Sequence, residues 1–210
     1  MERWTKVLTK KTTIAVLTVM IIATVLVATN VQALTNASAT SGGDGPWAER
    51  ATKALKKARH AIDGAIDKIV EQAEQGANVS LAKVVLKASI RIYGAAERLF
   101  GEGYYKKAFF AAVLSGLVAR DSARVAEDPE AIDAIMDEIG EKLGQVKDYI
   151  EELENSGVDV GLARKVLERA EKLYTKAEEL LEEKPVRALV AAEISRILAH
   201  VAEKIAQRTQ

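Results

Sequence analysis

Hydrophobic residues recur at steps of three and four along most of the chain beyond residue 46, which is the spacing of one face of an α-helix. The clearest run is Ile132, Ile135, Ile139, Leu143, Val146, Ile150 and Leu153. A stripe of this kind is typical of a helix that packs against other helices in the manner of a coiled coil. The pattern therefore predicts a protein built from helices.

Interruptions in this pattern divide the region into six segments. We expect helices at about 47–74, 81–100, 105–126, 130–154, 162–183 and 186–206. Asp128–Pro129 should begin the fourth helix and Pro185 the sixth, since a cap residue and proline both suit the first turn. Gly76 and Gly157 should end the helices before them, because glycine readily adopts the left-handed conformation found there.

The segment that begins at Gly76 recurs at Gly157. Identical residues return in the second segment at the positions of Gly76, Val79, Leu81, Ala82, Val85, Leu86, Tyr93, Ala96, Glu97 and Leu99. After a one-residue deletion, Ala108, Ala111, Ala112, Ser115 and Ala119 recur as Ala188, Ala191, Ala192, Ser195 and Ala199. The sequence thus predicts an all-α protein with two tandem copies of a three-helix bundle, residues 47–126 and 127–210.

The N-terminus has a different composition. Four of the first eleven residues are Lys or Arg, an apolar run follows, and no charged residue stands between Lys11 and Asp44. A basic head before an apolar segment is inserted with its N-terminus inside the cell. Two interpretations remain open: residues 1–33 form a signal peptide cleaved near Ala33, or residues 12–33 stay as a membrane anchor. Both place the remainder outside the cytoplasm.

Residues 34–46 are small, polar and rich in Gly and Ser, so we expect a flexible linker there. Asn36 and Asn78 each begin an Asn-X-Ser sequence, the acceptor pattern for N-glycosylation. Both are therefore predicted glycosylation sites of an exported chain.

The net charge of zero hides two opposite halves. Residues 47–126 carry 14 basic and 8 acidic residues, a net of +6, whereas residues 127–210 carry 12 and 20, a net of −8. The predicted interaction residues of the basic copy are Lys83, Lys87, Arg91, Arg98, Tyr104 and Tyr105. They suit lipid head groups, a cell-surface polymer or the acidic copy of a neighbouring molecule. The alternative is a solvated face and ordinary turn packing.

Candidate chemistry is sparse. Asp133 and Asp137 share a helix face, and Glu130 and Glu141 extend it, so these four carboxylates are a possible divalent-cation site. Solvated surface residues are the alternative. The chain has no cysteine, which excludes disulfides and thiolate ligands, and neither His60 nor His200 has a partner at metal-binding spacing. No catalytic motif is present, so we expect no enzyme and no cofactor.

These observations predict an exported, non-catalytic helical-repeat module that acts as a cell-surface structural or protein-interaction component. Its expected partner is another protein or itself, with possible contact with a membrane surface. Nucleic acid is not expected outside the cell. The alternative function is an extracytoplasmic bundle that binds a ligand or a divalent cation. Dense charge with little Asn, Gln and Met fits a thermophilic source.

Overall fold

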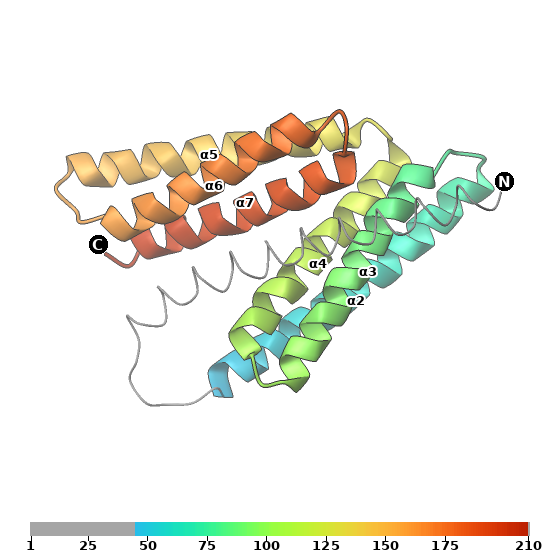
Figure 1. Ribbon diagram of the computed structural model, residues 1–210, viewed down its shortest axis with the longest axis horizontal. Coiled ribbons are helices and arrows are strands. Elements are labelled where there is room, and N and C mark those ends of the chain that lie inside the picture. The colour runs from blue at the N-terminus through green and yellow to red at the C-terminus, as the bar shows by residue number, and fades with distance from the viewer. Residues whose placement is uncertain (1–44, 210) are drawn as a thin grey trace.

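The computed structural model describes residues 45–209, and this part of the chain contains six α-helices and no strand. The helices are α2 (Gly45–Glu74), α3 (Ser80–Gly101), α4 (Tyr105–Glu127), α5 (Ala131–Asn155), α6 (Gly161–Leu180) and α7 (Pro185–Ala206) (Figure 1). The prediction of an all-α protein is confirmed. The largest difference from the predicted boundaries is at α6, which ends at Leu180 rather than at residue 183.

The predicted signal or anchor segment at 12–33 lies outside the described residues, as do the linker up to residue 44 and Asn36. Among the six described helices, none is both long enough and apolar enough to cross a membrane.

Glycines end several of these helices as predicted. Gly76 and Gly157 have φ angles of 85° and 83°, and Gly103, between α3 and α4, has a φ of 81°. Side chains with a Cβ rarely adopt this left-handed conformation, so each glycine lets the chain leave the helix at low cost.

Of the two prolines predicted to begin a helix, Pro185 does so and Pro129 does not. Pro185 is the first residue of α7, as expected. The expected cap at Asp128–Pro129 is wrong in detail, because α5 begins only at Ala131. The Asp128 Oδ1 atom instead accepts a hydrogen bond of 2.9 Å from the backbone N–H of Glu130, so Asp128, Pro129 and Glu130 form the turn that precedes the helix.

The helices pack in two sets. α2, α3 and α4, the first helical set, pack against one another, and α5, α6 and α7 form the second helical set. Within each set the third helix, α4 or α7, has the most extensive contacts. Figure 1 shows the two sets at a wide angle to each other, connected once by the turn between α4 and α5. They touch mainly where α4 crosses α7.

The core follows the hydrophobic pattern. All seven residues of the α5 stripe, Ile132 through Leu153, are buried. The central helices α4 and α7 contribute small side chains, and Ala112 and Ala192 are both 0% exposed. Buried serines add hydrogen bonds to neighbouring helices. Ser115 Oγ donates to the carbonyl oxygen of Ser89 at 3.0 Å, and Ser195 Oγ donates to that of Ala170 at 2.7 Å.

A pair of glycines on α5 gives a matched test of this packing. A Cβ at Gly140 would lie 2.7 Å from the Tyr174 hydroxyl, which donates to the Met136 carbonyl oxygen at 2.9 Å. A Cβ at Gly144 meets nothing within 4 Å. We expect Gly144→Ala to raise the free energy of unfolding by about 0.5–1 kcal/mol through helix propensity. Gly140→Ala should forfeit that gain, because it displaces the hydroxyl from its hydrogen bond, at a cost of about 1–2 kcal/mol.

Urea unfolding followed by circular dichroism measures both variants. Equal stabilisation by the two substitutions would show that Tyr174 is not held in the position described.

Candidate interaction site

A groove runs between α2 and α4 on the first helical set, with a volume of about 570 Å³. Its apolar floor consists of Ala54, Ala58, Ala61, Phe109, Ala112, Val113 and Gly116. Small residues let the two helices approach closely, and a Cβ at Gly116 would already lie 3.4 Å from the Ala58 Cα atom. At one end of the groove the Phe109 ring packs edge-on against Trp47, with the ring centres 5.8 Å apart.

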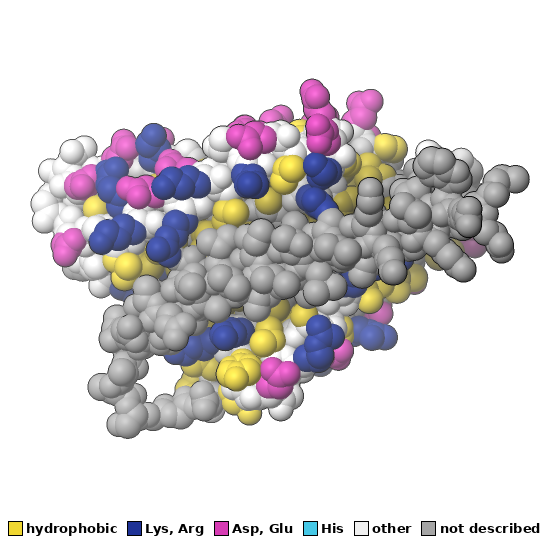
Figure 2. All heavy atoms as spheres, in the orientation of Figure 1, with side chains coloured by type: hydrophobic (Ala, Val, Ile, Leu, Met, Phe, Trp, Pro, Cys, Tyr) yellow, Lys and Arg dark blue, Asp and Glu magenta, His cyan; other side chains and the backbone are white. Residues whose placement is uncertain are grey.

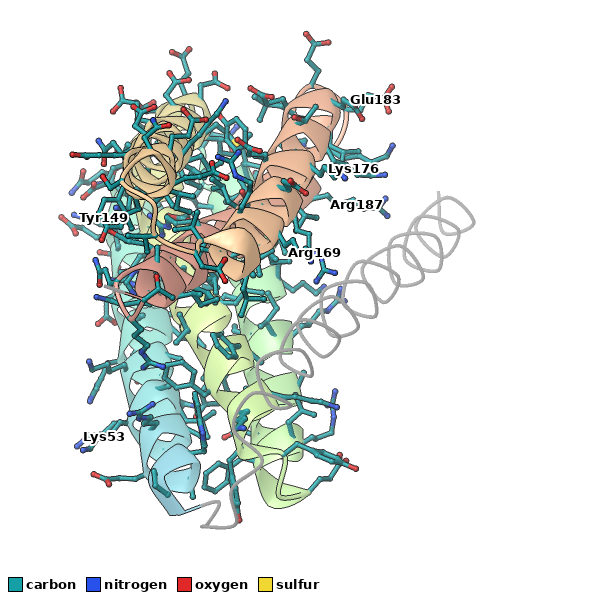
Figure 3. The ribbon with its side chains drawn as sticks, turned by 90° about the vertical axis from the view of Figure 1, so that its left-hand side faces the viewer. Lys53, Tyr149, Arg169, Lys176, Glu183 and Arg187 are labelled. Carbon is teal, nitrogen blue, oxygen red and sulfur yellow. The ribbon has the colours of Figure 1, made fainter. Side chains whose placement is uncertain are left out.

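The rim of the groove is basic. Arg50, Lys53, Lys57, His60 and Arg120 line it, and no acidic residue is among its lining residues. Lys53 pairs with Glu49 at 2.5 Å, and the Arg50 guanidinium lies 5.1 Å from the centre of the Trp47 ring. Figure 3 shows Lys53 pointing outward from α2, away from the second helical set. The groove therefore combines an apolar floor with a positive rim, which suits an acidic, partly apolar partner.

The predicted basic stripe lies elsewhere, on α3. Lys83, Lys87 and Arg98 are exposed there and Arg91 is half-buried, and none of the four lines the groove. Val84 and Ile90 are exposed on the same helix. The structure thus presents two basic surfaces on the first helical set.

The two predicted tyrosines differ in their surroundings. Tyr104 is 53% exposed, and the Lys107 ammonium lies 4.9 Å from the centre of its ring. Tyr105 is half-buried and packs edge-on against Phe100, with ring centres 5.2 Å apart. Tyr105 thus fits ordinary turn packing, the alternative that the sequence left open, whereas Tyr104 is accessible to solvent.

The predicted acidic site does not form a cluster. Glu130 precedes α5, and Asp133, Asp137 and Glu141 are exposed along it. Within residues 45–209, no group of three or more His, Cys, Asp or Glu side chains is arranged to hold a metal ion. Asn78 is exposed in the turn between α2 and α3, where its Oδ1 accepts a 3.2 Å hydrogen bond from the Ser80 N–H. Its glycosylation stays a prediction.

Sequence reasoning missed a buried pair of acids where α4 crosses α7. Asp121 of α4 is 3% exposed and Glu193 of α7 is 0% exposed. Arg196 donates from Nε to Glu193 Oε2 at 3.0 Å, and its Nη2 lies 2.7 Å from Oε1. The second approach is poorly aligned, so Glu193 Oε1 and Asp121 Oδ2 are buried without a hydrogen-bond partner among the described residues.

These surroundings raise the pKa of both acids. Burial raises the pKa of Asp121, and its interaction with the neighbouring Glu193 carboxyl group opposes that rise, as does the charge of Arg196. Burial, together with the charge of Asp121, raises the pKa of Glu193 from 4.5 to about 8, against the opposing effect of Arg196. At neutral pH the two acids therefore hold one proton between them.

No protein-family model, curated protein or solved structure matches the chain. Its function is therefore inferred from the geometry of the described residues.

Proposed function

We propose that the chain is an extracytoplasmic, non-catalytic interaction module made of two copies of a three-helix unit, and that its groove binds the acidic second helical set of another copy. The observation that carries this proposal is the groove itself, whose floor is apolar and whose lining residues include four Lys or Arg side chains and no acid, with Glu49 paired to Lys53 just outside it. The extracytoplasmic location rests on the basic and apolar pattern of the N-terminus.

The two-copy origin has support from the packing. Ser115 and Ser195 occupy matched positions in the repeat, and so do Ser89 and Ala170. The two serines make equivalent hydrogen bonds to these matched carbonyl groups. The third helix is also the central one in each set. Such agreement is expected when one unit is duplicated and both copies keep its contacts.

Charge complementarity favours a second copy as the partner. The net charge of −8 on residues 127–210 complements the +6 on residues 47–126. Figure 2 shows Asp and Glu side chains gathered along the edge of the second set that α5 forms. Asp133, Asp137 and Glu141 are exposed on that helix. Carboxylates exposed on this helix can pair with the cations on the groove rim of another copy.

Self-association of the full chain in detergent micelles tests this proposal. We expect association to weaken by at least about tenfold between roughly 50 mM and 500 mM salt, because exposed charge pairs are screened. The double variant Lys53→Glu/Lys57→Glu should abolish association, because it reverses two charges on the groove rim. The matched control, Lys83→Glu/Lys87→Glu on α3, changes the net charge equally and should associate as the native chain does.

Analytical ultracentrifugation provides the measurement. A chain that stays monomeric at low salt would contradict the choice of partner. A monomer whose Lys53 and Lys57 are needed for binding to anionic lipid vesicles would point instead to a membrane surface. The described residues offer no observation that favours the cation-binding alternative.

A further inference from the structure

We propose that Asp121 and Glu193 form a proton-binding site that holds the two helical sets together. In the packed arrangement the pair keeps one proton, and loss of that proton releases the contact between α4 and α7. This inference goes beyond the proposed function and does not depend on what occupies the groove.

The position of the pair is the first support. The two sets meet mainly where α4 crosses α7, and the chain passes between them once, at the turn before α5. Each set has its own packed helices, and the buried apolar residues of both sets join in one cluster across the crossing. A change of charge here can therefore alter the angle between the sets.

The balance of charge is the second support. With one proton bound, the pair carries one negative charge, which the Arg196 guanidinium balances. Loss of the proton adds a second buried negative charge, which Arg196 does not balance. Water would stabilise that charge, and separation of α4 from α7 admits water.

Two neighbouring arginines, Arg120 and Arg124, lower the pKa of Asp121 through their charges, but neither forms an ion pair with the two acids. Arg124 of α4 donates two hydrogen bonds to the Glu138 carboxylate of α5, at 2.9 and 2.6 Å. Arg120 of α4 is exposed at the groove rim. Ser122, next to Asp121 in α4, donates to the Ala82 carbonyl oxygen of α3 at 2.9 Å.

The repeat gives the third support. In the alignment that matches Ala108 to Ala188, the counterpart of Asp121 is Val201 and that of Glu193 is Val113. The third helix of each set, α4 or α7, thus has valine at the position where the other third helix has its acid. The acids are therefore not needed for the packing of a three-helix set, and their shared location is the crossing between sets.

A distance measurement across the crossing tests the proposal. The chain has no cysteine, so Glu102→Cys and Lys165→Cys place spin labels at exposed positions, one on each set. Pulsed electron paramagnetic resonance is recorded on the full chain in detergent micelles. We expect one narrow distance at about pH 6 and a second, longer distance above about pH 8, where the pair loses its proton.

Variants identify the group responsible. Glu193→Gln stays neutral at every pH and should keep the narrow distance throughout. Asp121→Asn leaves one acid beside Arg196, a balanced pair, and should do the same if Glu193→Gln fails to fold. The control variant Glu168→Gln is changed at an exposed position of α6, so it should show the same longer distance at high pH as the native chain.

Three results would overturn the inference. The first is a distance in the native chain that does not change with pH. The second is opening that persists in both acid-pair variants. The third is an equal change between labels at Glu74 and Glu102, both within the first set, since this would mean that the set itself unfolds.

Discussion

Arg196→Met is expected to lower the free energy of unfolding at neutral pH by about 3–5 kcal/mol, the usual cost of leaving a buried charge without its partner. Arg196 is the cation that contacts Glu193, whose side chain is fully buried. Methionine keeps much of the apolar stem of arginine, so the loss reports on charge rather than on volume. At about pH 5 the cost should be smaller, because the acids can then take up a second proton.

The matched control is Arg187→Met on the same helix. The Arg187 side chain points outward in Figure 3 and forms no ion pair within the described part of the chain. Its replacement should change the free energy of unfolding by less than about 0.5 kcal/mol. Guanidinium unfolding of both variants gives the comparison, and similar losses in the two would mean that Arg196 does not balance a buried charge.

The stability of the native chain should fall as pH rises from about 4.5 to about 8, the interval between the ordinary pKa of Glu193 and its pKa in the fold. In this interval the folded chain binds a proton that the unfolded chain has released, so each rise in pH favours unfolding. Each unit of raised pKa corresponds to about 1.4 kcal/mol, which makes the total effect at most roughly 5 kcal/mol. Above about pH 8 the folded chain has also released this proton, so the proton no longer contributes to the free energy of unfolding.

Glu193→Gln should remove most of this slope, since the amide does not titrate. Glu168→Gln replaces an exposed glutamate and should leave the slope unchanged. Urea unfolding at several pH values measures the slope for each chain. A flat profile in the native chain would contradict the raised pKa of Glu193.

The helices were predictable because their signals are local. The α5 stripe from Ile132 to Leu153 repeats at helical spacing, and Gly76 and Gly157 end helices through their own backbone freedom. Other features depend on which helix lies next to which, and here prediction was weaker. Tyr174 of α6, for example, donates to the Met136 carbonyl oxygen on α5, a contact that the spacing within one helix does not indicate.

The candidate sites show the same limit. The basic stripe on α3 follows from spacing along one helix, whereas the groove joins Lys57 of α2 to Arg120 of α4. Asp121 and Glu193 lie far apart in the chain, and no local pattern links them. One signal was available: each is an acid in an alanine-rich helix at a position where the other repeat has valine.

Arg120 belongs to both sites, since it lines the groove and its positive charge lowers the pKa of Asp121. A carboxylate of a partner that engages Arg120 would withdraw part of this charge from Asp121. Partner binding would then strengthen proton uptake, and thermodynamic reciprocity requires that acidification strengthen partner binding by the same factor. A chain assembled in this way would respond to the acidity of its surroundings, with Arg120 as the residue that couples the two sites.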